Sequence, residues 1–234
     1  MTARFASRLA AAVGALAVAV GACAGPSQEA GPIRSSPTAE SPSASETEAA
    51  PGAFDLFTPR GRASGKQLHY FEDVPSMTAT ADLVVRGRVT DVALGEPEYD
   101  PGDPSGKPVL TARVVTLEVT GVYRSGGEAP ATVRLYEGHF NRDGAGIQYG
   151  NVTWTKKGAT GIYFLTLNAH TGIYLLVSSQ GRVLLDSAGP ASSADDRDPL
   201  HKRIEQMTEP ELDEAIAKAA KAAKDGKIKP QKPL

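Results

Sequence analysis

The sequence predicts a mainly β protein, a small antiparallel Greek-key barrel of five to seven strands followed by a C-terminal α-helix. Alternating apolar and polar residues, the period of a half-buried strand, recur in segments between residues 82 and 186. The connections are mostly short and rich in turn residues, and no helical pattern separates the segments. Consecutive strands joined in this way pair antiparallel.

Seven segments carry the strand pattern. They lie at residues 82–92, 110–123, 131–137, 147–155, 161–167, 173–178 and 182–186, and a short helical turn at 73–81 precedes them. In the first, Leu83, Val85 and Val89 share one face, while Arg86 and Arg88 share the other. A five-residue loop and a tight Gln-Gly turn separate the last three strand segments, and such short connections indicate hairpins.

A C-terminal helix is expected over residues 208–226. Thr208 and Glu211 fit a capping box, and Gly226 closes the segment. The apolar residues at helical spacing are Leu212, Ile216, Ala219, Ala220 and Ala223. Such a narrow stripe favours packing against the barrel. The alternatives are a helix that binds a partner, and a lysine-rich end and basic tail (227–234) that contact acidic polymer or lipid headgroups.

Residues 1–22 have the layout of a secretory signal. Arg4 and Arg8 precede a twelve-residue apolar run, and small residues follow it. The run is too short for a permanent membrane span, which takes about 20 apolar residues. Val20-Gly21-Ala22-Cys23 resembles a bacterial lipobox, and this resemblance implies a lipidated cysteine at the start of the mature protein. Two acyl chains, such as palmitate, suffice for stable anchoring.

Cys23 is the only cysteine, so the domain cannot form an internal disulfide. The thiol lies at the position that lipidation requires. The alternative is an ordinary secretory signal cleaved after Ala22 or Ala24, which would release a soluble secreted protein. We favour the lipoprotein, which predicts a location on the extracytoplasmic face of the cell membrane, held by a lipid anchor on Cys23.

Residues 23–52 are predicted to form a lipidated, disordered stalk rich in Pro, Ser and Ala. The part from 35 to 52 contains no aliphatic or aromatic residue larger than Ala, so it cannot bury enough apolar surface to offset the entropy of ordering. A flexible chain of this length spans about 30 Å. Large apolar residues return after it, and the β domain is expected over 53–207.

Composition and motifs argue against several functions. The formal net charge is −2, and −4 without the two signal arginines, so we expect no nucleic-acid partner. The four histidines do not have metal-ligand spacing, and nucleophile elbows and phosphate-binding loops are not found. We therefore expect no metal, cofactor or catalytic residue. The loop with Glu96, Glu98, Asp100 and Asp103 lacks the regular carboxylate spacing of a Ca²⁺ loop, which favours a solvated acidic loop.

One stretch is a candidate ligand surface. The side chains are Tyr136, His139, Phe140, Tyr149 and Trp154. They lie in or beside a long connection between strands, where aromatic rings often hold a sugar, a peptide or a base. The alternative is that these rings plug the barrel end or complete the core.

The order of the strand segments resembles a broad group of exported bacterial proteins. The resemblance is carried by Ala81–Val89, by Val119–Gly126, by the short strand at 131–137 and by Ile162–Leu167. That group resembles an OB-type barrel, akin to netrin and tissue-inhibitor-of-metalloproteinase-like modules, and the resemblance covers about residues 78–186. The eukaryotic inhibitors present an N-terminal cysteine and several disulfides, which this domain lacks. The resemblance therefore implies the fold and an extracytoplasmic location, but not protease inhibition.

The function expected from the sequence is that of a membrane-anchored lipoprotein whose domain is a non-catalytic binding or scaffold module. Its expected partners are the membrane, through the lipid anchor, and an envelope protein or polysaccharide. The alternatives are an enzyme acting on cell-wall polymer and a purely structural envelope protein. An enzyme brings at least two titratable groups into one pocket. Convergence of Glu137, His139 and Asp143 in a deep cleft would therefore favour catalysis.

Overall fold

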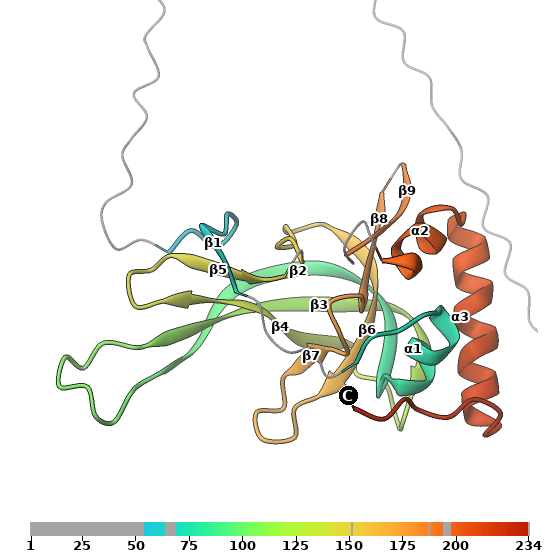
Figure 1. Ribbon diagram of the computed structural model, residues 1–234, viewed down its shortest axis with the longest axis horizontal. Helices are drawn as coiled ribbons and strands as arrows, with labels where there is room; N and C mark the ends of the chain where they lie inside the picture. The colour runs from blue at the N-terminus through green and yellow to red at the C-terminus, as the bar shows by residue number, and fades with distance from the viewer. Residues whose placement is uncertain (1–53, 64–68, 151, 187, 194–197, 234) are drawn as a thin grey trace, which may run out of the picture. The chain divides into compact units, whose positions relative to one another are not determined.

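The computed structural model describes residues 54–63, 69–150, 152–186, 188–193 and 198–233. Contacts divide the chain into Met1–Thr47 and Glu48–Leu234, and every described residue belongs to the second unit. The expected signal (1–22), Cys23 and the stalk (23–52) lie outside the described residues. The second unit is mainly β with a C-terminal helix, as predicted (Figure 1).

The elements follow one another in a run of strands with helices near both ends. They are β1 Gly61–Ala63, α1 Val74–Thr80, β2 Leu83–Glu98, β3 Leu110–Ser125, β4 Thr132–Asn141, β5 Gly146–Tyr149, β6 Thr160–Leu167, β7 Tyr174–Leu176, β8 Arg182–Asp186, β9 Gly189–Ser192, α2 Pro199–Glu205 and α3 Glu209–Lys224. The sequence did not predict β1, β9 or α2. It also placed a strand at 147–155, whereas β5 ends at Tyr149.

The strands form one sheet in the order β1-β5-β4-β3-β2-β6-β8-β9, and β7 pairs with both β4 and β6. Most neighbouring strands are antiparallel, as the short connections predict. The β1–β5 and β4–β7 pairs are parallel, which the sequence analysis did not anticipate. Each involves a three-residue strand: β7 lies within the strand predicted at 173–178, whereas β1 was not predicted.

The β2–β3 hairpin is longer than expected. Residues 93–107 were predicted to be a loop, but β2 continues to Glu98, which pairs with Leu110. A register shift before Pro97 accommodates a residue that cannot donate to the ladder. The N–H of Val109 then donates to the Glu98 carbonyl at 2.8 Å. The hairpin reaches away from α3, at the left of Figure 1.

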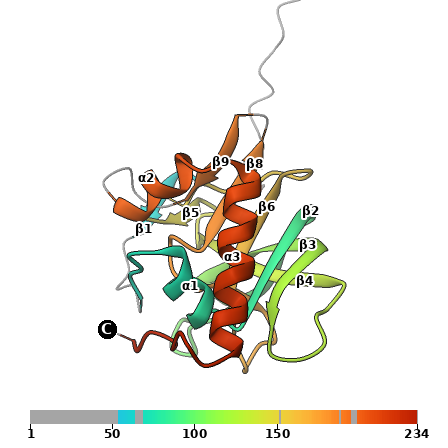
Figure 2. The same ribbon diagram turned by 90° about the vertical axis from the view of Figure 1, so that its right-hand side faces the viewer.

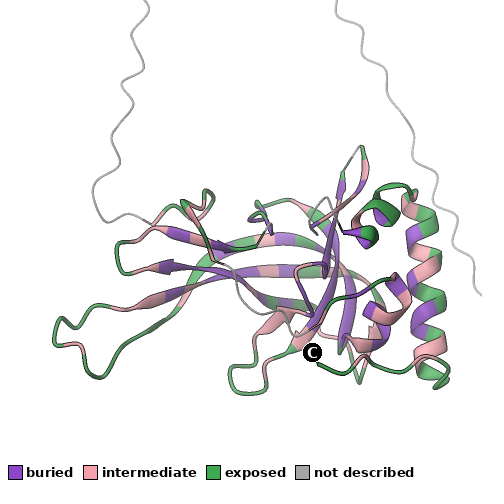
Figure 3. Ribbon diagram, viewed as in Figure 1, coloured by how far each residue is buried: buried purple, intermediate pink, exposed green. Residues whose placement is uncertain are grey.

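The interior consists of two apolar clusters, because β2 and β6 are buried on both faces (Figure 3). One cluster joins Val84 and Phe164 to the three helices. The other, on the opposite face, joins Leu83 and Val85 to β3 and β4. Both faces carry apolar residues in alternation, so each stabilises the fold by removing apolar surface from water.

The helices begin at the residues that their capping side chains predict. Asp73 caps α1 by accepting from the N–H of Ser76 at 2.7 Å. Thr208 and Glu211 form the predicted capping box of α3. The buried side chains of α3 are Leu212, Ile216, Ala219 and Ala220. The helix therefore packs on the sheet with its apolar stripe, and α1 lies beside it (Figure 2).

Candidate binding surface on β4 and β5

The site is built on β4 and β5, whose connection is closed by Asn141. The Asn141 side-chain oxygen accepts the N–H of Ala145 at 2.9 Å. Gly144 has a φ of 74°, a conformation that glycine adopts readily. The turn sets His139 opposite Ile147 in the antiparallel register. Local turn chemistry therefore fixes which side chains of β4 meet those of β5.

A β-bulge in β4 sorts the side chains of this hairpin onto two faces. Tyr136 and Gly138 pair with consecutive residues of β3, so Glu137 between them is an extra residue. Tyr136 and His139 lie on the outer face, where both rings contact Tyr149. Glu137 and the next aromatic residue, Phe140, are turned toward the interior.

The outer face carries a compact group of polar rings. The hydroxyls of Tyr136 and Tyr149 are 3.0 Å apart and share a hydrogen bond. The centroid of the His139 ring is 5.2 Å from that of Tyr149. Tyr149 is 37% exposed and His139 is 9% exposed, and Nδ1 of His139 has no hydrogen-bond partner among the described residues. We call Tyr136, His139 and Tyr149 the outer aromatic patch.

Glu98 of β2 supplies a carboxylate near the outer aromatic patch. Burial lowers the pKa of His139 below its ordinary value, and the negative charge of Glu98 opposes this shift. The imidazole is therefore neutral at pH 7, with one nitrogen as donor and the other as acceptor. Burial also raises the pKa of Tyr136, so its hydroxyl stays protonated. The patch presents neutral hydrogen-bonding groups beside apolar ring surface.

Phe140 and Trp154, the other two candidate ligand residues, lie in the interior. Phe140 is fully buried and Trp154 is 6% exposed, with their rings 5.2 Å apart in an edge-to-face arrangement. Trp154 packs directly on Gly138 and Gly146, where a Cβ atom would come within 2.5 and 2.3 Å of the indole. For these two rings, the structure agrees with the alternative that they complete the core.

The same interior contains a buried ionic network. Glu137 accepts hydrogen bonds from the guanidinium groups of Arg113 and Arg182, and all three side chains are at most 1% exposed. Thr155 donates its backbone N–H to Glu137 at 3.0 Å and its hydroxyl at 2.8 and 2.9 Å. Both carboxylate oxygens are thus satisfied, as a buried charge requires.

Both arginines also donate to backbone carbonyls, while Nε of Arg182 has no hydrogen-bond partner among the described residues. Arg113 donates to Leu56 at 2.7 Å and to Thr155 at 2.6 Å. Arg182 donates to Thr153 at 2.6 Å. The guanidinium carbon of Arg113 lies 4.7 Å from the Trp154 ring centroid. These bonds hold residues 153–155 in an irregular path, which explains why the predicted strand over 147–155 ends early.

The three titratable groups that would indicate catalysis do not converge in the described structure. Glu137 is enclosed by the two arginines, while His139 lies on the opposite face of β4. Asp143 is exposed in the turn that follows. Among the described residues, no group of three or more His, Cys, Asp or Glu side chains could hold a metal ion. The acidic loop instead has internal partners, since Asp103 pairs with Arg142.

Neither arginine of the buried network was predicted from the sequence, although the sequence carries a signal for Arg113. Arg113 is in phase with the inward residues Val115 and Leu117 of its strand, and Glu137 is in phase with Leu135. A charge on the apolar face of a half-buried strand requires a partner of opposite charge. Matching the charges that are in phase with the core would have paired these residues.

None of the helices in the described ranges is long and apolar enough to span a membrane. No protein-family model matches the chain, and no curated protein matches it significantly.

Proposed function

We propose that this chain is an extracytoplasmic lipoprotein whose β domain is a non-catalytic binding module for an envelope polysaccharide. The observation that carries the proposal is the outer aromatic patch, which combines the 37% exposed ring of Tyr149 with the two phenol hydroxyls of Tyr136 and Tyr149, over the buried ring of His139. Sugar rings present apolar C–H faces flanked by hydroxyls, and such a patch offers matching stacking and hydrogen-bonding groups. The carboxylate of Glu98 adds an acceptor for sugar hydroxyls.

Binding rather than catalysis is favoured by the fate of the acidic residues nearby. Both carboxylate oxygens of Glu137 are hydrogen-bonded within the buried network, so neither oxygen is available for proton transfer to a ligand. The neutral outer aromatic patch would contact a polysaccharide through weak, repeated interactions. This mode suits a domain that is held close to its polymer.

The binding proposal is tested with purified full chain and envelope polysaccharide freed of protein. In a co-sedimentation assay, Tyr149→Ala should weaken retention about tenfold, because a stacking ring at an interface is worth about 1–3 kcal/mol. Tyr70→Ala is the matched control, since Tyr70 is similarly exposed at 43% but lies outside the patch. Equal retention of both variants, or release of soluble fragments from the polymer by the unaltered chain, would overturn the proposal.

The anchor is proposed on the sequence pattern that ends at Cys23. Cys23→Ala should abolish the attachment of acyl chains and reduce the membrane-bound fraction, whereas globomycin, which blocks the cleavage before the lipidated cysteine, should leave a lipidated precursor of higher mass in the membrane. Ser27→Ala, which keeps the cysteine, is the control and should stay with the membrane. A free thiol in the intact mass of the mature protein would refute lipidation.

We also infer that β2, β3, β4, β7 and β6 close into an OB-type barrel. The support is a circuit of pairings, in which β7 joins β4 at Leu135–Tyr174 and joins β6 at Leu165–Leu176. A closed barrel removes sheet edges, so the amides of the short strand β7 should be protected from hydrogen exchange. Fast exchange there, at the rate of the neighbouring 168–173 loop, would argue for an open sheet.

A further inference from the structure

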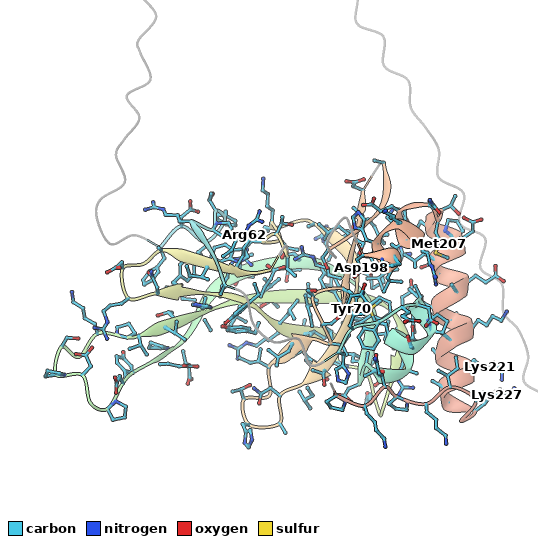
Figure 4. The ribbon with its side chains drawn as sticks, viewed as in Figure 1. Arg62, Tyr70, Asp198, Met207, Lys221 and Lys227 are labelled. Atoms are coloured by element: carbon cyan, nitrogen blue, oxygen red, sulfur yellow. The ribbon has the colours of Figure 1, made fainter. Side chains whose placement is uncertain are left out.

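A groove of about 640 Å³ runs along α3, on the far side of the domain from the β2–β3 tip. One wall is α3 itself, and the other includes Pro75 of α1. Met207 closes one end, and Ile228, which follows α3, lines the other. In Figure 4, Met207 is at the top of α3, and Lys221 and Lys227 are near its lower end.

The face of α3 that lines the groove carries small side chains in the middle and charged side chains at the rim. Ala215 and Ala222 are partly exposed and present only methyl groups, which let another backbone approach closely, and the buried Ala219 lies between them at the floor of the groove. Glu214 and Lys218 stand at the rim, one turn apart and exposed. Neither has an ion-pair partner among the described residues. The groove therefore has an acidic half toward the start of α3 and a basic half toward its end.

We propose that this groove is the interface of a homodimer, in which α3 of a second copy lies antiparallel to α3 of the first. With the two-fold axis at the level of Ile216, Glu214 of each copy is level with Lys218 of the other. Both members of the pair come from the same surface, as a two-fold interface requires. The antiparallel arrangement also places opposite ends of the two helix dipoles together.

The ends of the groove complement each other under the same symmetry. Met207 of one copy is brought to the level of residue 225 of the other, beside Ala222 and Ile228. The N–H of Ile228 donates to the Ala222 carbonyl at 3.4 Å, which fixes Ile228 next to that helix turn. Apolar groups therefore cover apolar groups at both ends, while the charged pairs flank the centre.

A second copy fits this groove better than a partner helix of uniform charge. An acidic segment would be repelled at Glu214, and a basic segment would be repelled at Lys218. Only a partner with the reverse order of charges satisfies both, and α3 read in the opposite direction has that order. The proposal does not depend on the ligand of the outer aromatic patch, which lies on β4 and β5.

Disulfide trapping in cells that express the full chain tests the interface directly. Ala215 lies close to the two-fold axis, so Ala215→Cys should give a disulfide-linked dimer under mild oxidation. Ala217→Cys is the matched control, because Ala217 is exposed at nearly the same level of α3 but is not part of the groove. Both variants keep Cys23, so any background from that residue is equal.

Charge reversal then tests the arrangement. In the Ala215→Cys background, Glu214→Lys and Lys218→Glu should each reduce the trapped dimer at least about threefold, because each places like charges in contact twice. The double reversal should restore it, since complementarity returns with opposite sign. Failure of the double variant to recover, equal trapping of Ala215→Cys and Ala217→Cys, or trapping of another protein in place of a second copy would overturn the proposal.

Discussion

The most informative perturbation of this fold is Glu137→Gln, which removes one negative charge and little volume. The carboxylate lies between the guanidinium groups of Arg113 and Arg182 with its side chain fully buried. Glutamine keeps one acceptor oxygen but turns an N–H₂ donor toward one of the arginines. The variant therefore leaves two buried cations without a counter-charge and sets donor against donor.

The magnitude follows from the contacts that are lost. Glu137 accepts two charge-assisted bonds from the arginines and two further bonds from Thr155. Each charge-assisted bond contributes about 1.5–3 kcal/mol, but such bonds are not additive within one network. Breaking a buried ion pair by removing one partner costs about 3–5 kcal/mol, and we expect a loss in this range. It is a large part of the roughly 5–15 kcal/mol that stabilises a typical domain.

Equilibrium urea unfolding of the mature chain measures this loss directly. A 3–5 kcal/mol loss corresponds to a fall in Tm of about 6–20 °C for a chain of this size. Glu118→Gln is the control, because Glu118 is exposed and its pairing with Arg88 at 3.7 Å contributes about 0–1 kcal/mol. A Glu137→Gln variant no less stable than the control would show that the network is not what holds this part of the fold.

Further predictions concern the outer aromatic patch, the Trp154 site and the attachment of α3. Because burial lowers the pKa of His139 below 6.5, the unfolded chain takes up its proton first as pH falls. This contribution to stability is complete above about pH 6.5 and declines below it, a slope that His139→Gln should remove in unfolding titrations. Gly146→Ala places a methyl group 2.3 Å from the indole and should cost about 1–3 kcal/mol, with a red shift in the emission of Trp154, the only tryptophan. Gly127→Ala, where a Cβ meets open space, should leave the emission unchanged. Asp213→Asn removes the α3 carboxylate that accepts from Tyr123 and, at 2.8 Å, from Arg86, and should cost about 0.5–1.5 kcal/mol and speed hydrogen exchange in α3.

The regular elements were predictable because each has a recognisable pattern in its own local sequence. The alternation in β2, β3 and β6 predicted strands, and the Thr208 capping box predicted where α3 begins. The short strands β1 and β9 were missed. They are three and four residues long; β1 pairs with β5, which is distant in the sequence, and β9 begins Gly-Pro and shows no strand pattern, although it pairs with the adjacent β8. The continuation of β2 to Glu98 was hidden by Gly95 and Pro97, which normally mark loops.

The candidate site was predictable in composition but not in arrangement. Three of the five residues proposed from the sequence, Tyr136, His139 and Tyr149, contact one another on the outer face, whereas Phe140 and Trp154 contact each other in the interior. The bulge at Glu137 places Phe140 on a different face from Tyr136 and His139. A single extra residue in a strand reverses the alternation that follows it, and it leaves no mark in composition. The choice between surface and interior was therefore open for each ring until the pairing register was known.

The hydrogen bond from Arg113 to the Leu56 carbonyl has a mechanical consequence. A pull applied to the N-terminal end of the described chain reaches Leu56 before any strand, and Arg113 passes that force directly into the buried carboxylate. After Leu56 the chain enters β1, which pairs with β5 over its whole length. A pull that passes Leu56 therefore acts on several backbone hydrogen bonds at the same time. If the chain is tethered as proposed, drag on the domain is borne by its interior and not by a fraying end.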